Sequence, residues 1–149
     1  MKLIRENKEK QRTIYFCGDR YKKVWENATP EWVEHHAQLL RKYLPGYVLD
    51  FGGNWIDYAI IPGVPASTVE HTPEFINRIY KFCLDSIVDT YPYVHGDWAL
   101  SNILVDGDNL RLCDWDNLGV YPMEEVKAKL ITDLTDAFGK TFQQYAQLS

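Results

Sequence analysis

The stretch VHGDWALSNILV, residues Val94–Val105, places polar residues between two apolar flanks. Its right flank leads into a polar turn, Asp106–Asn109, and then into a second apolar run, Leu110–Cys113, which ends at the acidic segment Asp114–Asp116. Two short apolar runs joined by a polar turn predict a β-hairpin. Contact with a ligand would explain the polar residues beside this hairpin, because a plain core strand would carry apolar residues there.

The order of these polar residues indicates a specific chemistry. His95, Asp97 and Asn102 form the pattern H-x-D-x-x-x-x-N, and Asp114 follows the second strand of the expected hairpin. In phosphoryl transfer one carboxylate accepts the proton of the attacking hydroxyl, while an amide oxygen and a second carboxylate hold Mg²⁺ against the nucleotide phosphates. A lone Asp-x-x-x-x-Asn is also common in turns, where both side chains cap backbone groups. The histidine and the later aspartate favour the phosphoryl-transfer interpretation.

Composition and charge limit the possible partners. The chain has 149 residues, and its hydrophobic content of 46% is typical of a globular protein that can bury a core. A net charge of -5 argues against a nucleic-acid or anionic-membrane partner. No run of about 18 apolar residues predicts a membrane span, and the charged N-terminus does not resemble a signal peptide. Three cysteines without CxxC spacing suit reduced thiols, so we expect a cytoplasmic protein.

Alternating patterns and turn residues predict the elements of the N-terminal part. Four segments favour strands: Thr13–Cys17, Arg20–Trp25, Tyr47–Phe51 and Trp55–Ile61. Thr29 followed by Pro30 predicts the start of a helix that continues to Leu44. Before Thr13 the chain has only twelve residues, mostly charged, which we expect to leave little room for a further strand pair.

The C-terminal part is expected to be mainly helical. The segment Pro62–Pro65 predicts a stiff connector and a boundary between two subregions. Thr72 followed by Pro73 predicts a second helix, and apolar spacing predicts a last helix over about Met123–Tyr145. The predicted fold class is therefore α+β, with subregions 1–61 and 62–149 in one compact unit.

The sequence HGDWALSNILV followed by LCDWDN resembles the aminoglycoside phosphotransferase and choline kinase-like group of small-molecule kinases. The resemblance implies that Asp97 is the catalytic base and His95 a structural histidine of the catalytic loop. It implies that Asn102 and Asp114 bind Mg²⁺, and Asp116 lies where many relatives carry a further acidic residue. The fold it implies is a reduced protein-kinase-like fold with two lobes: a small antiparallel sheet with one helix, then a mainly helical lobe that carries the catalytic hairpin.

The resemblance also implies a lysine on a strand and a glutamate on the next helix for the nucleotide phosphates. It favours Lys23, and strand alternation sends Lys22 to the opposite face. The alternative for Lys23 is a solvated strand lysine. Glu34 is the preferred glutamate, with Glu31 as the second candidate.

Three further expectations come from the same comparison. Ile60 and Ile61 would face the adenine ring as a hinge. Asp133 would support the catalytic loop structurally. The triplet Asp50–Gly52 spells Asp-Phe-Gly but precedes the catalytic loop, so it is assigned no metal.

The expected function is an ATP- or GTP-dependent, Mg²⁺-assisted transfer of the γ-phosphate to a hydroxyl of a small molecule. The alternative is a kinase-like module that binds nucleotide or serves as a scaffold with little or no turnover. Gly18 is the only glycine before Lys23, so no glycine-rich phosphate loop is present, and this favours the alternative. A reduced fold of this kind would expose apolar surface, which predicts a homodimer.

Overall fold

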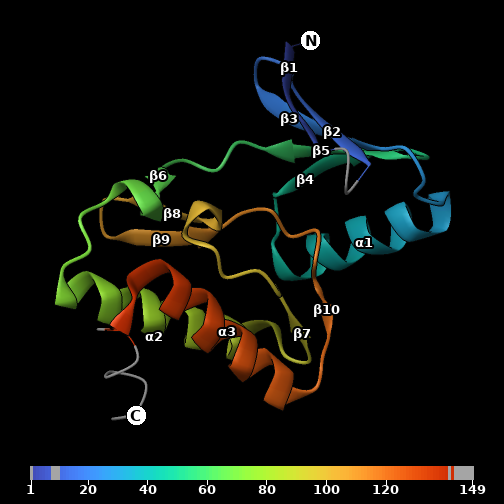
Figure 1. The fold of residues 1–149 in the computed structure, drawn as a ribbon. Coiled ribbons are helices and arrows are strands. Elements are labelled where there is room, and N and C mark those ends of the chain that lie inside the picture. Colours follow the sequence, from blue (N-terminus) through green and yellow to red (C-terminus); the bar gives the residue numbers. More distant parts are fainter. Residues whose placement is uncertain (1, 8–10, 141, 143–149) are drawn as a thin grey trace. The chain divides into compact units, whose positions relative to one another are not determined.

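The computed structural model describes residues 2–7, 11–140 and 142 (Figure 1). The chain divides into two compact units, Met1–Ile60 and Ile61–Ser149, which we call the first and the second unit. The boundary falls one residue before the one drawn from the sequence. Helices and antiparallel strand pairs occur together, so the chain belongs to the α+β class.

The first unit contains a five-stranded antiparallel sheet with the order β1-β2-β3-β5-β4. Its strands are β1 (Lys2–Asn7), β2 (Arg12–Phe16), β3 (Arg20–Trp25), β4 (Val48–Phe51) and β5 (Trp55–Ala59). The residues before Thr13, expected to leave little room for a further strand pair, contribute one additional strand, β1, that pairs with β2. Because β1 is an edge strand, it can carry charged residues that a central strand would exclude.

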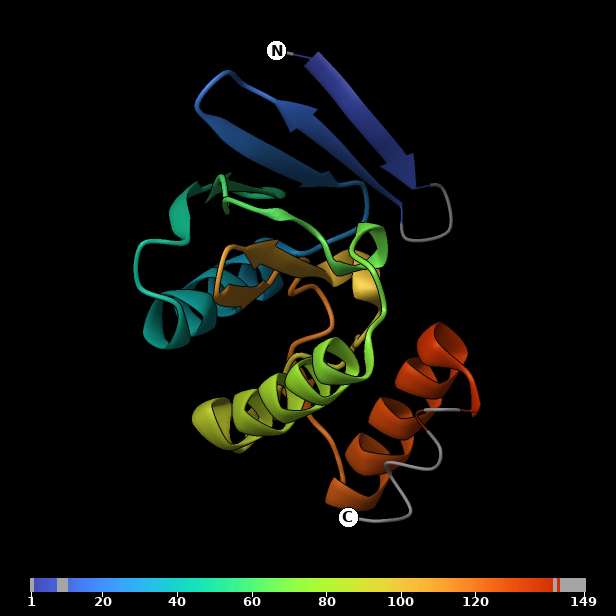
Figure 2. The ribbon, with the colours of Figure 1, turned by 90° about the vertical axis from the view of Figure 1, so that its left-hand side faces the viewer.

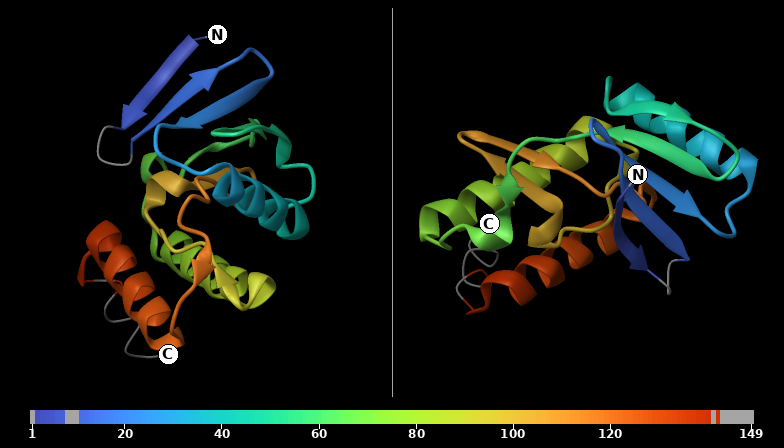
Figure 3. Two further views of the ribbon diagram at one scale, coloured as in Figure 1. Left: turned by 90° about the vertical axis from the view of Figure 1, so that its right-hand side faces the viewer. Right: turned by 90° about the horizontal axis from the view of Figure 1, so that it is seen from above.

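Helix α1 (Pro30–Tyr43) contacts β4 and β5 of the sheet (Figure 3). Its start is confirmed, because the Thr29 hydroxyl accepts a hydrogen bond from the amide of Trp32 at 3.1 Å. The helix ends before Gly46, which adopts a φ of 86° that favours glycine. Its buried residues repeat at helical spacing: Val33, His36, Ala37 and Leu40.

A three-stranded antiparallel sheet in the second unit carries the predicted hairpin. Its strands follow the order β6 (Val64–Pro65), β8 (Ile103–Asp106) and β9 (Asn109–Leu112). The hairpin β8–β9 is confirmed, but the expected connector Pro62–Pro65 contributes a strand. Gly63 makes this approach possible, because a Cβ there would lie 2.8 Å from the backbone oxygen of Val105.

Two long helices, α2 (Pro73–Thr90) and α3 (Met123–Phe138), pack side by side in the second unit (Figure 2). The α2 cap is confirmed by a hydrogen bond from the Phe75 amide to the Thr72 hydroxyl at 3.1 Å. Helix α3 ends at Gly139, and the predicted continuation toward Tyr145 falls largely outside the described residues. A short pair, β7 (Tyr93–Val94) and β10 (Gly119–Val120), completes the unit.

Two global expectations can be compared with the structure. Within the described part of the chain, none of the helices combines the length and apolar character needed to cross a membrane. The three cysteines, Cys17, Cys83 and Cys113, are all free. Burial raises the pKa of the Cys83 thiol to about 12, so this cysteine stays protonated and unreactive.

Candidate active site

The hairpin β8–β9 brings Asn102 and Asp114 to the same end of two paired strands. Ile103 lies opposite Leu112, and the amide of Cys113 extends the ladder by donating to the carbonyl of Asn102 at 2.8 Å. Asn102 directly precedes β8, and Asp114 follows β9 by two residues. Strand pairing therefore brings Asn102 and Asp114, which are separated in sequence, close together.

His95 fixes the loop that contains Asp97. The histidine is 1% exposed, and its Nδ1 accepts a hydrogen bond from the amide of Asp97 at 3.1 Å. Its Nε2 donates to the carbonyl of Cys113 at 2.8 Å, so the ring proton belongs on Nε2. The ring also contacts Trp98 and, edge-on, Trp115. Because both nitrogens bond to the backbone, His95 is a structural residue that ties the loop to the end of β9.

Asp97 is half-buried and held in a defined position. Its Oδ1 accepts a hydrogen bond from the amide of Ala99 at 3.3 Å, which closes a small turn after the carboxylate. A carboxylate that is positioned but still partly accessible can accept a proton from a bound hydroxyl.

Helix α3 supports the same loop through Asp133. The Oδ2 of Asp133 accepts a hydrogen bond from the amide of Trp98 at 3.0 Å, as expected for a residue that supports the loop. Its Oδ1 lies 2.7 Å from the Nζ of Lys129, one helical turn earlier. This hydrogen bond is the main cause of a raised pKa of Lys129, to which the charges of Asp133, Asp97 and Asp136 add.

Sequence reasoning missed Lys129. The signal that could have found it is its position four residues before Asp133, since side chains at this spacing meet on a helix surface.

Asp114 has an unusual backbone conformation. Its φ is 57°, in the left-handed region that non-glycine residues rarely adopt. Such a conformation costs free energy and is concentrated at functional sites, where the surrounding structure maintains it. Aspartate and asparagine tolerate it better than other side chains.

The donor atoms near the hairpin end suit Mg²⁺ that arrives with phosphates. Asn102 is 8% exposed, and Asp114 and Asp116 are half-buried. Within the described residues no three His, Cys, Asp or Glu side chains form a metal-binding cluster. An amide oxygen and one or two carboxylates fit Mg²⁺ whose remaining ligands are phosphate and water oxygens.

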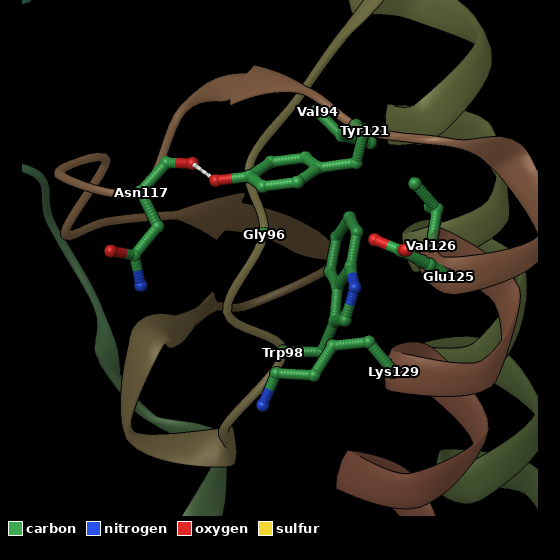
Figure 4. A pocket seen from close by; sticks show the side chains of 8 residues that line it. All are labelled: Val94, Gly96, Trp98, Asn117, Tyr121, Glu125, Val126 and Lys129. Carbon is green, nitrogen blue, oxygen red and sulfur yellow. Dashed lines mark hydrogen bonds between the residues drawn. The ribbon is translucent and has the colours of Figure 1, made fainter.

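A cavity of about 410 Å³ borders the loop 95–102, which we call the candidate catalytic loop (Figure 4). Gly96 and Trp98, the neighbours of Asp97, line it, together with residues of β7, α3 and the segment 117–121. Gly96 has a φ of 85°, and a Cβ there would lie 3.0 Å from the backbone oxygen of Asn117. That oxygen accepts a hydrogen bond from the Tyr121 hydroxyl. Glycine at position 96 therefore allows the segment 117–121 to pack directly on the loop.

In the first unit, the two neighbouring lysines of β3 have different environments. Lys23 is 6% exposed and lies 5.3 Å from the centre of the Tyr58 ring, so it is not a solvated strand lysine. Lys22 forms an ion pair with Asp57 at 2.9 Å and lies 3.5 Å from the centre of a Trp55 ring.

Helix α1 does not present its expected glutamate on its buried face. Glu34 is exposed, as is Glu31, whereas His36 is 4% exposed and stacks on Trp32. Burial, and after it the positive charge of Lys23, lowers the pKa of His36 to about 4. The physical reason is helical spacing, because the register that buries Val33 and His36 turns Glu34 outward.

The remaining expected residues, Ile60 and Ile61, lie on either side of the boundary between the two units. Ile60 is 43% exposed and Ile61 is half-buried. The triplet Asp50–Gly52 lies at the end of β4, where the Asp50 carboxylate accepts a hydrogen bond from the amide of Phe51.

Comparison with known proteins gives a structural likeness only. No family model matches the chain, and no curated protein matches it. The crystal structure of monomeric WbdD is similar, with a TM-score of 0.60 at 19% sequence identity. The alignment covers 86% of this chain and 37% of that chain, so this protein spans little more than a third of WbdD. At this identity the likeness concerns the fold.

Proposed function

We propose that this protein is a phosphotransferase that moves the γ-phosphate of ATP or GTP to a hydroxyl of a small molecule. The observation that carries the proposal is the construction of the loop. His95 ties the backbone of Asp97 to the end of β9, and the same hairpin end carries Asn102 and Asp114. These residue types, in this order, are those that phosphoryl transfer uses.

In the proposed reaction the oxygen of the acceptor hydroxyl forms a bond to the γ-phosphorus. The bond between that phosphorus and the β–γ bridging oxygen breaks, and the nucleoside diphosphate leaves with its electron pair. The hydroxyl proton passes to the carboxylate of Asp97. The hydrogen bond from Ala99 to one carboxylate oxygen would orient this base.

Mg²⁺, when bound, would neutralise charge on the phosphate oxygens. We assign its protein ligands to Asn102 and Asp114, with Asp116 as a further acidic residue of the same segment. Lys23 is proposed as a phosphate contact, because it is a buried lysine on a central strand, where the resemblance to small-molecule kinases places the phosphate-binding lysine.

The alternative, a nucleotide-binding or scaffold module with little turnover, is favoured by one sequence feature. No glycine occurs between Met1 and Cys17, so the first strands lack a glycine-rich phosphate loop. Phosphate transfer itself distinguishes the two functions.

The test is a screen of radiolabelled phosphate transfer over classes of small hydroxyl compounds, with Mg²⁺ and either nucleotide. We expect Asp97→Asn to lower turnover at least about 100-fold, since general-base catalysis contributes this much or more. Nucleotide affinity should stay within a few fold, because the asparagine oxygen can still accept the hydrogen bond from Ala99. Retention of most of the turnover in this variant would remove Asp97 from the catalytic role.

A further inference from the structure

The cavity beside the candidate catalytic loop has apolar inner walls. Val94, Trp98 and Val126 are each at most 5% exposed and belong to β7, the loop and α3 (Figure 4). The ring of Tyr121 forms a further wall. At about 410 Å³ the cavity is within the range of pockets that hold small molecules. Such walls favour binding of a ligand with apolar surface, because that surface is removed from water.

One polar group in these walls has no partner in the described part of the chain. The Nε1 of Trp98 is buried and lacks a hydrogen-bond acceptor. In Figure 4 the ring edge that bears this nitrogen faces α3, whose residues 125, 126 and 129 also line the cavity. A buried donor without an acceptor is unfavourable by about 1–3 kcal/mol. A ligand oxygen between Trp98 and α3 could supply the acceptor.

The lining offers a charged ligand no buried countercharge, so such a ligand would lose its hydration without compensation. The ammonium of Lys129 lines the cavity but is already paired with Asp133 at 2.7 Å. The carboxylate of Asp133, which holds Lys129, is not itself part of the lining. Glu125 and Lys129, the charged residues of the lining, are both exposed, so solvent screens their charges.

We infer that this cavity binds the phosphate acceptor, and that the acceptor is an uncharged hydroxyl compound with an apolar body. Its body contacts Val94, Val126 and Tyr121, and an oxygen of the ligand accepts a hydrogen bond from Trp98. The role as acceptor rests on the proposed function, whereas the preference for an uncharged, apolar ligand does not.

A pair of probes with equal shape tests this preference. 3,3-Dimethylbutan-1-ol and choline differ in one atom, carbon or nitrogen, and therefore in charge. Binding of each to the full chain is measured by saturation-transfer NMR titration, without nucleotide or Mg²⁺. We expect the neutral alcohol to bind in the millimolar range and choline to bind at least tenfold more weakly. Equal or tighter binding of choline would overturn the inference.

Two variants assign the binding to the cavity. Val126→Trp adds volume to an inner wall and should weaken binding of the neutral alcohol at least tenfold. The matched control is Val88→Trp, the same substitution at a position of α2 that is 74% exposed, and it should leave binding unchanged. Trp98→Phe keeps an aromatic wall but removes the donor, and should weaken binding about three- to tenfold. If circular dichroism shows that Val126→Trp is not folded, Trp98→Phe alone tests whether the alcohol binds in this cavity.

Unchanged binding of the alcohol in a folded Val126→Trp or in Trp98→Phe would overturn the assignment to this cavity. Failure of the proposed function gives a different result. In that case the neutral alcohol binds and depends on Val126 and Trp98, but no phosphate is transferred to it or to any other hydroxyl compound with either nucleotide.

Discussion

Lys22 and Lys23 are neighbours in sequence, but their side chains have different surroundings and therefore different expected roles. Lys22 is held by Asp57 and Trp55 within the first unit, whereas Lys23 is almost fully buried. Buried ionisable groups are concentrated at functional sites, so Lys23 is the better candidate for a ligand contact.

We expect Lys23→Ala to weaken binding of Mg-ATP about tenfold or more and to lower turnover. Lys22→Ala is the matched control and should leave nucleotide affinity within about twofold. Because it breaks an ion pair, it should instead lower the free energy of unfolding by up to about 1 kcal/mol. Calorimetric titration of both variants is the measurement. If Lys22→Ala loses nucleotide affinity and Lys23→Ala retains it, Lys22 is the phosphate contact.

His36 predicts a pH dependence of stability. Its pKa is about 4 in the folded protein and near 6.5 when unfolded, so the unfolded chain binds more protons between these values. The free energy of unfolding should therefore fall as pH decreases from 6.5 to 4, by about 3 kcal/mol at most from this residue. Urea unfolding of wild type and His36→Phe across this range measures the difference. The exposed His35→Phe serves as control, and equal pH slopes for wild type and His36→Phe would contradict the prediction.

At the scale of elements, the candidate site depends on how the segment 117–121 packs on the candidate catalytic loop. Gly96 allows this contact through both its positive φ and its lack of a Cβ. Gly107, in the turn of the hairpin β8–β9, has a φ of 59° but no atom within 4 Å of a hypothetical Cβ. A comparison of alanine substitutions at these two glycines therefore separates the cost of a positive φ from the cost of a steric clash.

We expect Gly107→Ala to cost about 1 kcal/mol, which is the strain of a left-handed residue alone. Gly96→Ala should cost about 1–3 kcal/mol more, since its Cβ would displace the carbonyl of Asn117. It should also reduce phosphate transfer by disturbing the loop around Asp97. Denaturant unfolding and turnover of both variants provide the test. A Gly96→Ala variant as stable and active as Gly107→Ala would show that the segment adapts freely.

At the scale of the whole molecule, ligand binding should increase the stability of the folded protein. A ligand that binds only the folded chain stabilises it by about 2.7 kcal/mol at a hundredfold excess over its dissociation constant. We expect Mg-ATP to raise the melting temperature of the wild type, and the Mg²⁺-dependent part to vanish in Asp114→Asn. Asparagine tolerates the left-handed backbone at this position, so the empty variant should be at least as stable as the wild type. Thermal melts of both proteins with and without Mg-ATP provide the measurement. If the melting temperature of the wild type shows no Mg²⁺-dependent shift at millimolar nucleotide, the scaffold function is favoured.

Local sequence by itself determined the elements whose signals lie within a few residues. Thr29 and Thr72 cap α1 and α2 as predicted, because a threonine before a proline satisfies free amides at the next turn. The hairpin β8–β9 follows from its turn, and the order of His95, Asp97 and Asn102 followed by Asp114 is the basis of the proposed phosphoryl transfer. Strand alternation also distinguished Lys22 from Lys23.

Only the tertiary structure decided features that depend on segments distant in sequence. Strands β1 and β6 form because a partner strand satisfies their backbone groups, which their charged or proline-containing sequences do not reveal. His36 rather than Glu34 occupies the buried face of α1, since packing on the sheet sets the register of the helix. Lys129 and the cavity lie beside the loop 95–102 because Asp133 of α3 binds the amide of Trp98 in that loop. The pairing of β6 with β8 and the hydrogen bond from Trp98 to Asp133 join residues more than thirty positions apart, and no local pattern encodes them.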